Sequence, residues 1–302
     1  MIDWTPSATA IQIGPLAIPW YGIGYAVAIG LGFWLSAVQA RRRGLDTAFI
    51  GDAMLWVVVL GVIGARLYHV IDQWQLYQHD LLRIVLPPYS GLALYGGVGG
   101  GILGLVIAAR RRRQSFFAWA DVAIPSLFFG QAIARWGNFF NQELYGPPTN
   151  LPWGIAIDCA HRVAAYPCST YPLQSTGFQP LFFYEATLTV TGGLIALWAS
   201  RRLADRLRDG DLLSFWFIWY GAARAVLEPL RSADSQANIG IAVVIAFGAV
   251  AVVGGALSIY LRHRGPRRPT AEPAAALPSP ALEAPPAAPP EAPAPMDGPP
   301  PP

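Results

Sequence analysis

Seven stretches of apolar residues, separated by short polar or charged segments, run along this chain. The hydrocarbon core of a bilayer takes about 20 residues of α-helix to cross, and each stretch is near that length. Charged residues make up only 13% of the chain, against about 25% in ordinary soluble domains. We therefore predict an all-α integral membrane protein with seven transmembrane helices, at Trp20–Ala40, Phe49–Ile71, Ser90–Ala109, Phe116–Ala134, Pro180–Ser200, Leu212–Leu230 and Ile239–Leu261.

Arginine clusters follow the first, third, fifth and seventh apolar stretches. Because Lys and Arg near the ends of spans stay on the cytoplasmic side, all four clusters are expected there, with the N-terminus outside and the C-terminus cytoplasmic. No charged segment or cleavage site marks the first stretch as a signal peptide, so we expect it to be a retained helix. The clusters are Arg41–Arg43, Arg110–Arg113, Arg201–Arg208 and Arg262–Arg268.

The chain is expected to form one transmembrane domain over residues 1–265, with an external loop region at 141–179. Residues 266–302 are Pro and Ala with scattered Glu, a composition that cannot bury enough apolar surface to fold, so they predict a disordered cytoplasmic tail. The net charge is +3, but the arginines lie where topology and anionic lipid headgroups require them. Nucleic acid is therefore not an expected partner.

Both cysteines, Cys159 and Cys168, fall in the external loop region. In an oxidising compartment we expect them to form a disulfide, with two unpaired thiols as the alternative. The sequence contains no CxxC, HxxxH or HExxH spacing, so we expect no metal site.

Arginines also lie inside the apolar stretches or at their ends, notably Arg66, Arg135 and Arg224. Each costs about 2.5–3.5 kcal/mol at the centre of a membrane helix unless it is partnered. Buried ion pairs between helices are one explanation, and a bound anion is the other. Tyr220, Arg224, Glu228 and Arg231 are spaced to form one stripe along a helix face.

Together with Arg231, these residues make four arginines. Only three acidic residues are expected near the same depth in the membrane: Glu143, Glu185 and Glu228. One cation remains by this count, and a phosphate group would complement it with charge-assisted hydrogen bonds. A second unusual feature is the glycine-rich segment GLALYGGVGGG at residues 91–101, which contains Tyr95. Its glycines allow close approach of either a helix or a lipid.

Six segments carry a family likeness: WYGIGY at 20–25, GARLYHV at 64–70, GLALYGG at 91–97, ARWGNFFNQELYG at 134–146, QPLFFYE at 179–185 and YGAARAVLEPLRSAD at 220–234. Together they resemble the bacterial prolipoprotein diacylglyceryl transferases, over about Trp20–Leu261. The resemblance implies a multi-pass enzyme of the bacterial inner (plasma) membrane. It would transfer the diacylglyceryl group of phosphatidylglycerol to the lipobox cysteine of a preprolipoprotein, forming a thioether and releasing glycerol phosphate, without a cofactor.

The resemblance also implies roles for individual residues. Arg135 and Arg224 match the two arginines that the family requires, and we assign them to the phosphodiester and the departing phosphate. Asp234 ends the motif of the sixth span. The candidate substrate-binding residues are Tyr21, Arg66, Asn138, Asn141, Glu143, Gly146, Tyr220, Glu228 and Arg231.

Tyr95 is a departure, because many relatives carry His at this position. A tyrosine hydroxyl, with an ordinary pKa near 10, is a poor base at neutral pH, so Tyr95 is expected to donate a hydrogen bond or to position the thiol. The substrate cysteine then either ionises beside the arginines without a dedicated base or passes its proton to another group. An anion or lipid transporter is the alternative function, and another phosphatidylglycerol-using transferase is a further one.

Overall fold

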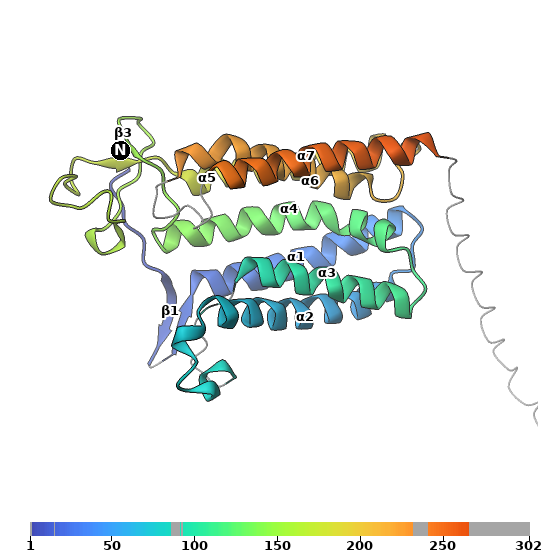
Figure 1. Cartoon of the computed structure of the whole chain (residues 1–302), viewed down its shortest axis with the longest axis horizontal. Coiled ribbons are helices and arrows are strands. Elements are labelled where there is room, and N and C mark those ends of the chain that lie inside the picture. The colour runs from blue at the N-terminus through green and yellow to red at the C-terminus, as the bar shows by residue number, and fades with distance from the viewer. Residues whose placement is uncertain (1, 15, 86–90, 92, 232–240, 266–302) are drawn as a thin grey trace, which may run out of the picture. The chain divides into compact units, whose positions relative to one another are not determined.

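A computed structural model of the chain describes residues 2–14, 16–85, 91, 93–231 and 241–265. The described residues are mostly helical, and their helices run along a common direction (Figure 1). This confirms the expected helical class. The α-helices are α1 (Trp20–Arg42), α2 (Ala48–Asp72), α3 (Leu94–Arg111), α4 (Phe116–Phe140), α5 (Leu181–Arg202), α6 (Asp211–Leu227) and α7 (Ile241–Arg264).

Five of these helices, α1, α2, α4, α5 and α7, are long and apolar enough to cross a membrane by length and composition. The other two are shorter, with 18 residues in α3 and 17 in α6. At 1.5 Å per residue, α6 is about 26 Å long, somewhat less than the hydrocarbon thickness of about 30 Å. It ends at Leu227, before the expected Leu230, because Pro229 lies in the 3-10 turn η4 (Glu228–Leu230) and cannot continue an α-helix.

Helix α4 lies at the centre of the helical packing and contacts α1, α3, α5 and α6. Hydrophobic clusters lie on two sides of it. One joins it to α1, α2 and α3 through Trp119, and the other joins it to α5 and α6 through Phe128. The buried Asp121 fixes one end of this packing, because its carboxylate accepts hydrogen bonds from the backbone N–H groups of Gly210 and Leu213 at the start of α6, both at 2.9 Å.

Helices α2 and α3 approach backbone to backbone. Gly96, Gly100 and Gly104, spaced four residues apart, lie over the α2 backbone at Gly64, Leu60 and Trp56 respectively. A Cβ atom added at Gly100 would lie 2.7 Å from the carbonyl carbon of Leu60, which is too close for any side chain. These three glycines therefore serve close helix packing, one of the two explanations that the sequence left open.

The external loop region contains strands that the hydrophobic pattern did not predict. Strands β3 (Pro148–Thr149) and β4 (Gly177–Phe178) pair antiparallel, and Ile155 bridges both Phe178 and the N-terminal Ile2. A second hairpin, β1 (Thr9–Ile13) with β2 (Leu16–Pro19), precedes α1. These strands are two to five residues long, so they leave too few alternating positions to be recognised in a sequence.

Cys159 and Cys168 form a disulfide, as expected. Within the loop that it closes, the Arg162 guanidinium lies 4.3 Å from the centre of the Phe178 ring and donates a hydrogen bond to the carbonyl of Ile157 at 2.7 Å. Burial lowers the pKa of Arg162 from its ordinary value, although Tyr145 and Asp158 oppose that shift. The loop is thus packed around a partly buried cation in addition to its disulfide.

Candidate active site

Helix α4 continues to Phe140, six residues beyond the expected Ala134, and so carries the first half of the RWGNFFNQELYG motif on its last turns. Aromatic packing extends it, since Phe140 stacks on Trp20 with ring centres 4.4 Å apart. Arg135 and Asn138 lie one turn apart on this helix. Arg135 Nη1 donates a hydrogen bond to Asn138 Oδ1 at 3.2 Å.

Three arginines converge on two glutamates beside this end of α4. Glu185, from α5, forms an ion pair with Arg135 and accepts from Arg231 Nη2 at 2.7 Å, while Arg224 Nη1 lies 3.7 Å away. Glu228 lies 2.8 Å from Arg224 Nη2 and 3.6 Å from Arg231 Nε. We call these five residues the arginine cluster.

The cluster is largely withdrawn from solvent, and no side chain in it is more than 18% exposed. With all five groups ionised it carries a net charge of +1. Both explanations of the intramembrane arginines therefore have support, because the arginines are paired and one positive charge still remains. Part of the cluster lines a small pocket together with residues of α4, α5 and α6: Gln131, Arg135, Glu185, Thr189, Tyr220, Ala223, Arg224 and Leu227.

Arg231 belongs to the cluster, but it does not lie on the helix on which it was expected. The helical stripe ends with α6 at Leu227, and Arg231 follows Pro229 in extended backbone. Its guanidinium nevertheless returns to Glu185 and Glu228. Tyr220 and Arg224 remain on α6, where the Tyr220 ring stacks on Trp216 at 5.2 Å. The residues of the stripe are brought together, but not by one continuous helix.

A second polar group adjoins the cluster through Asn138. Glu143 accepts hydrogen bonds from the Tyr21 hydroxyl at 3.0 Å, from Asn138 at 2.9 Å and from Asn141 at 3.5 Å. The Asn138 amide also donates to the Tyr21 oxygen. Asn138 is buried, and it joins Arg135 on one side to Glu143 on the other.

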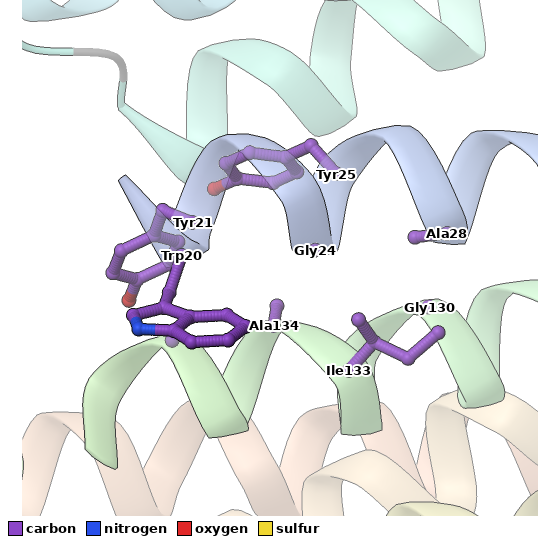
Figure 2. A pocket seen from close by; sticks show the side chains of 9 residues that line it. Trp20, Tyr21, Gly24, Tyr25, Ala28, Gly130, Ile133 and Ala134 are labelled. Atoms are coloured by element: carbon purple, nitrogen blue, oxygen red, sulfur yellow. The ribbon is translucent and has the colours of Figure 1, made fainter. Parts of the chain in front are cut away.

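Gly137 makes room for Tyr21 in this second group. A Cβ atom at Gly137 would lie 2.6 to 2.8 Å from atoms of the Tyr21 ring. The glycine of the motif is therefore required by the close approach of α1 and α4. Beside it the two helices enclose a pocket lined by Trp20, Tyr21, Gly24, Tyr25, Ala28, Gly130, Ile133, Ala134 and Gly137 (Figure 2).

The two pockets lie on different faces of α4. Gly130, Ile133 and Ala134 face α1 in Figure 2, whereas Gln131 and Arg135 line the pocket towards α5 and α6. In Figure 2 the side chains of Trp20 and Tyr21 reach from α1 towards α4. The mostly apolar pocket and the charged pocket are thus separated by a single helix, and Asn138 connects their polar ends.

Other candidate residues lie elsewhere. Arg66 lies on α2 and donates hydrogen bonds to the carbonyls of Arg83 at 2.6 Å, Ile84 at 3.0 Å and Gly91 at 3.1 Å, so it is grouped with the segment between α2 and α3. The backbone N–H of Gly146 donates to the Gln179 carbonyl at 2.9 Å, and a Cβ atom there would lie 3.0 Å from the Leu230 oxygen.

Two candidates cannot be placed in this arrangement. Tyr95 belongs to the first turn of α3, but its side chain lies outside the described part of the structure. Asp234 also lies outside the described residues.

Two residues of this region were not among the sequence candidates. Glu185 was noted only as an acidic residue near the right depth, yet it contacts all three arginines of the cluster. Gln142 is buried, donates to the Pro6 carbonyl at 3.1 Å and to Asp158 at 2.8 Å, and has a positive φ of 52°. Gln142 could have been identified from the sequence by its position between the candidate residues Asn141 and Glu143. Its contacts tie the motif to the N-terminal arm.

Comparison with known proteins gives a consistent answer. The chain is 38% identical over 258 residues, 82% of its length and 87% of the relative's, to a phosphatidylglycerol–prolipoprotein diacylglyceryl transferase of Synechococcus elongatus. Proteins of the same name from Thermosynechococcus vestitus, at 39% identity over 75% of this chain and 82% of the relative, and from Chloroflexus aggregans, at 33% over 83% and 87%, are also similar. A model of the prolipoprotein diacylglyceryl transferase family matches residues 8–261. With helices α1 to α6 and the arginine cluster inside that match, the chain belongs to the prolipoprotein diacylglyceryl transferase family.

Proposed function

We propose that this protein transfers the diacylglyceryl group of phosphatidylglycerol to the lipobox cysteine thiol of preprolipoproteins. The products are a thioether-linked lipoprotein precursor and glycerol phosphate, which makes this the first step of lipoprotein maturation. The observation that carries the assignment is the arginine cluster, with a net charge of +1 beside a pocket on α4. A phosphodiester carries one negative charge and complements it.

Arg135 and Arg224 are the proposed phosphate ligands, because both line the charged pocket. A guanidinium presents planar pairs of N–H donors that match phosphate oxygens. Arg231 and Glu228 are more deeply buried and are assigned to holding Arg224 in position. Tyr220 lines the same pocket and is assigned to the lipid headgroup, as are the Asn138 and Asn141 amides.

The proposed reaction is a displacement at carbon. The cysteine sulfur attacks the glyceryl carbon that bears the phosphate, the C–S bond forms, and the C–O bond breaks with its electron pair passing to the phosphate oxygen. Negative charge therefore grows on the departing glycerol phosphate. Fixed positive groups such as Arg135 and Arg224 stabilise that charge more in the transition state than in the ground state. This step calls for no cofactor.

The same arrangement supports a proposed orientation in the membrane. The disulfide loop and the arginine cluster lie at the end of the helices where α4 ends and α5 begins (Figure 1). Disulfides persist in oxidising compartments, so this end is proposed to face outward from the bacterial inner membrane. We assign seven spans by including α3 and α6, a transmembrane domain at residues 1–265 and an external N-terminus. The tail expected at residues 266–302 lies outside the described residues.

The decisive experiment supplies purified protein with phosphatidylglycerol and a lipobox peptide. Mass spectrometry should find the diacylglyceryl thioether on the peptide and an equal amount of glycerol phosphate. A peptide with Ser in place of the lipobox Cys, and phosphatidylcholine in place of phosphatidylglycerol, are the matched controls. Absence of the thioether product from folded protein would refute the assignment. No observation on the described residues favours an anion or lipid transporter.

A further inference from the structure

The Glu143 carboxylate is held by one oxygen. The hydroxyl of Tyr21 and the amides of Asn138 and Asn141 all donate to Oε1. Within the described part of the chain, Oε2 has no hydrogen-bond donor, and the residue is exposed. Three donors on one oxygen fix the direction of the carboxylate and leave the second oxygen available to accept a proton.

Glu143 differs in this respect from the other two glutamates of the site. Glu185 has three arginines within 4 Å and Glu228 has two. Among the described residues no arginine forms an ion pair with Glu143. A carboxylate that is closely bound by guanidinium groups is a weak proton acceptor, because the neighbouring positive charge favours its ionised form. Glu143 lacks that direct neutralisation.

The titratable and charged groups that face Glu143 come from two helices. Tyr21 and Tyr25 approach from α1 with their rings 5.8 Å apart, and Arg135 approaches from α4 through the Asn138 amide. Tyr21 and Tyr25 also line the pocket between α1 and α4. The carboxylate therefore lies at the polar end of one pocket and one side chain away from the phosphate ligand Arg135 of the other.

We infer that Glu143 is the proton acceptor for the substrate thiol, an assignment that rests on the proposed function. The thiol proton passes to Glu143 Oε2, and the resulting thiolate attacks the glyceryl carbon while Arg135 and Arg224 hold the phosphate that departs. The proton then leaves Glu143 for water or for the departing phosphate. This assigns the proton to a group other than Tyr95, whose hydroxyl is a poor base.

The test compares two charge-removing variants across pH. Glu143→Gln keeps an oxygen for the three donors and replaces the accepting oxygen by an amide, so the network is retained and only proton acceptance is lost. Glu185→Gln is the matched control, since it removes a carboxylate that acts only through the arginines. Single-turnover transfer to a lipobox peptide is measured at saturating phosphatidylglycerol from pH 7 to pH 9.

A free cysteine thiol with a pKa of about 8.5 is about 3% ionised at pH 7 and about 76% at pH 9. Without its proton acceptor the enzyme depends on thiol that has already ionised. Glu143→Gln should therefore transfer the diacylglyceryl group about 10²- to 10⁴-fold more slowly than wild type at pH 7. The ratio of the wild-type rate to the Glu143→Gln rate should fall by about 25-fold between pH 7 and pH 9. The ratio of the wild-type rate to the Glu185→Gln rate should stay constant from pH 7 to pH 9.

A ratio for Glu143→Gln that stays constant with pH, or an equal recovery by Glu185→Gln, would overturn the inference. A second measurement does not need the variant to fold: wild-type transfer should change less than threefold from pH 7 to pH 9, and a rise that follows thiol ionisation would also overturn it. A selenocysteine peptide, ionised at pH 7, should restore Glu143→Gln at that pH. Wild type that forms no thioether at any pH would instead refute the proposed function itself.

Discussion

Two adjacent glycines of α3 offer a direct test of how the helices pack. Gly100 faces α2, where a Cβ atom would lie 2.7 Å from the Leu60 carbonyl carbon and 3.2 Å from the Gly61 Cα. Gly99, the preceding residue, would place its Cβ atom with nothing within 4 Å. Replacing either glycine by alanine adds the same methyl group to the same helix. The two variants differ only in what that methyl group meets.

The expected effects have opposite signs. Carbon atoms pack best at about 3.5 to 4.0 Å, and the Leu60 carbonyl oxygen lies even closer to the added Cβ atom than the carbonyl carbon does, so Gly100→Ala must move the α2 and α3 backbones apart by about 1 Å or more. Inserting a methyl group into such a contact costs about 1–3 kcal/mol. Gly99→Ala instead gains up to about 1 kcal/mol from the higher helix propensity of alanine. Because alanine raises the helix propensity equally at both positions, the two variants should differ by the packing cost alone, about 1–3 kcal/mol in the free energy of unfolding.

Unfolding of the purified protein in mixed micelles, with increasing sodium dodecyl sulfate, measures this difference through tryptophan fluorescence. Gly100→Ala should unfold at a lower detergent fraction than wild type, and Gly99→Ala at an equal or higher one. Midpoints at or above that of wild type for both variants would show that α2 and α3 do not approach in the way described. Equal destabilisation by both would attribute the effect to the helix itself instead of to the contact.

Three further predictions concern the site and the loop. Arg135→Ala and Arg224→Ala should slow single-turnover transfer at saturating phosphatidylglycerol by about 10²- to 10³-fold, and the Lys variants should also be severely impaired because Lys lacks the paired donors of Arg; near wild-type rates would refute the phosphate assignment. Gly137→Ala should displace the neighbouring α1 tyrosine ring at a cost of about 1–3 kcal/mol and slow transfer at least fivefold, a result that unchanged kinetics would contradict. Replacing Cys159 and Cys168 together by Ser should lower stability by about 2–3 kcal/mol but leave the rate per folded molecule within twofold, so a well-folded but inactive variant would reverse the structural assignment.

The sequence predicted the helices well because a membrane span is a local property. Each span needs about 20 apolar residues in succession, and such runs are visible without knowing what they contact. Errors arose at the ends, where local chemistry changes. Helix α6 ends early, at Leu227, because Pro229 follows it, and α4 runs on to Phe140, which packs on an aromatic ring distant in sequence.

The candidate site residues also fall into two groups: those that a local motif identifies and those that only the packing of distant segments brings together. Arg135 and Asn138 became candidates because they lie close together in one motif, which the structure then places on the last turns of α4. The role of Glu185 could not be identified in this way, because it meets the arginines only after α5 packs against α4 and α6. Arg66 illustrates the opposite case, since its intramembrane charge suggested the site but its guanidinium bonds to backbone carbonyls after α2. Charge and depth restrict the candidates, whereas partners are decided by packing.

The relation between the two polar groups explains why an amide lies between them. The arginine cluster carries a net positive charge suited to a phosphodiester, and ionised Glu143 carries a negative charge suited to accepting a proton. A direct ion pair between Arg135 and Glu143 would weaken both functions, because each charge would neutralise the other. Asn138 prevents this: its oxygen accepts from Arg135 and its amide donates to Glu143. One neutral side chain thus lies between the proposed phosphate-binding arginines and the proposed proton acceptor, and it keeps their charges from pairing directly.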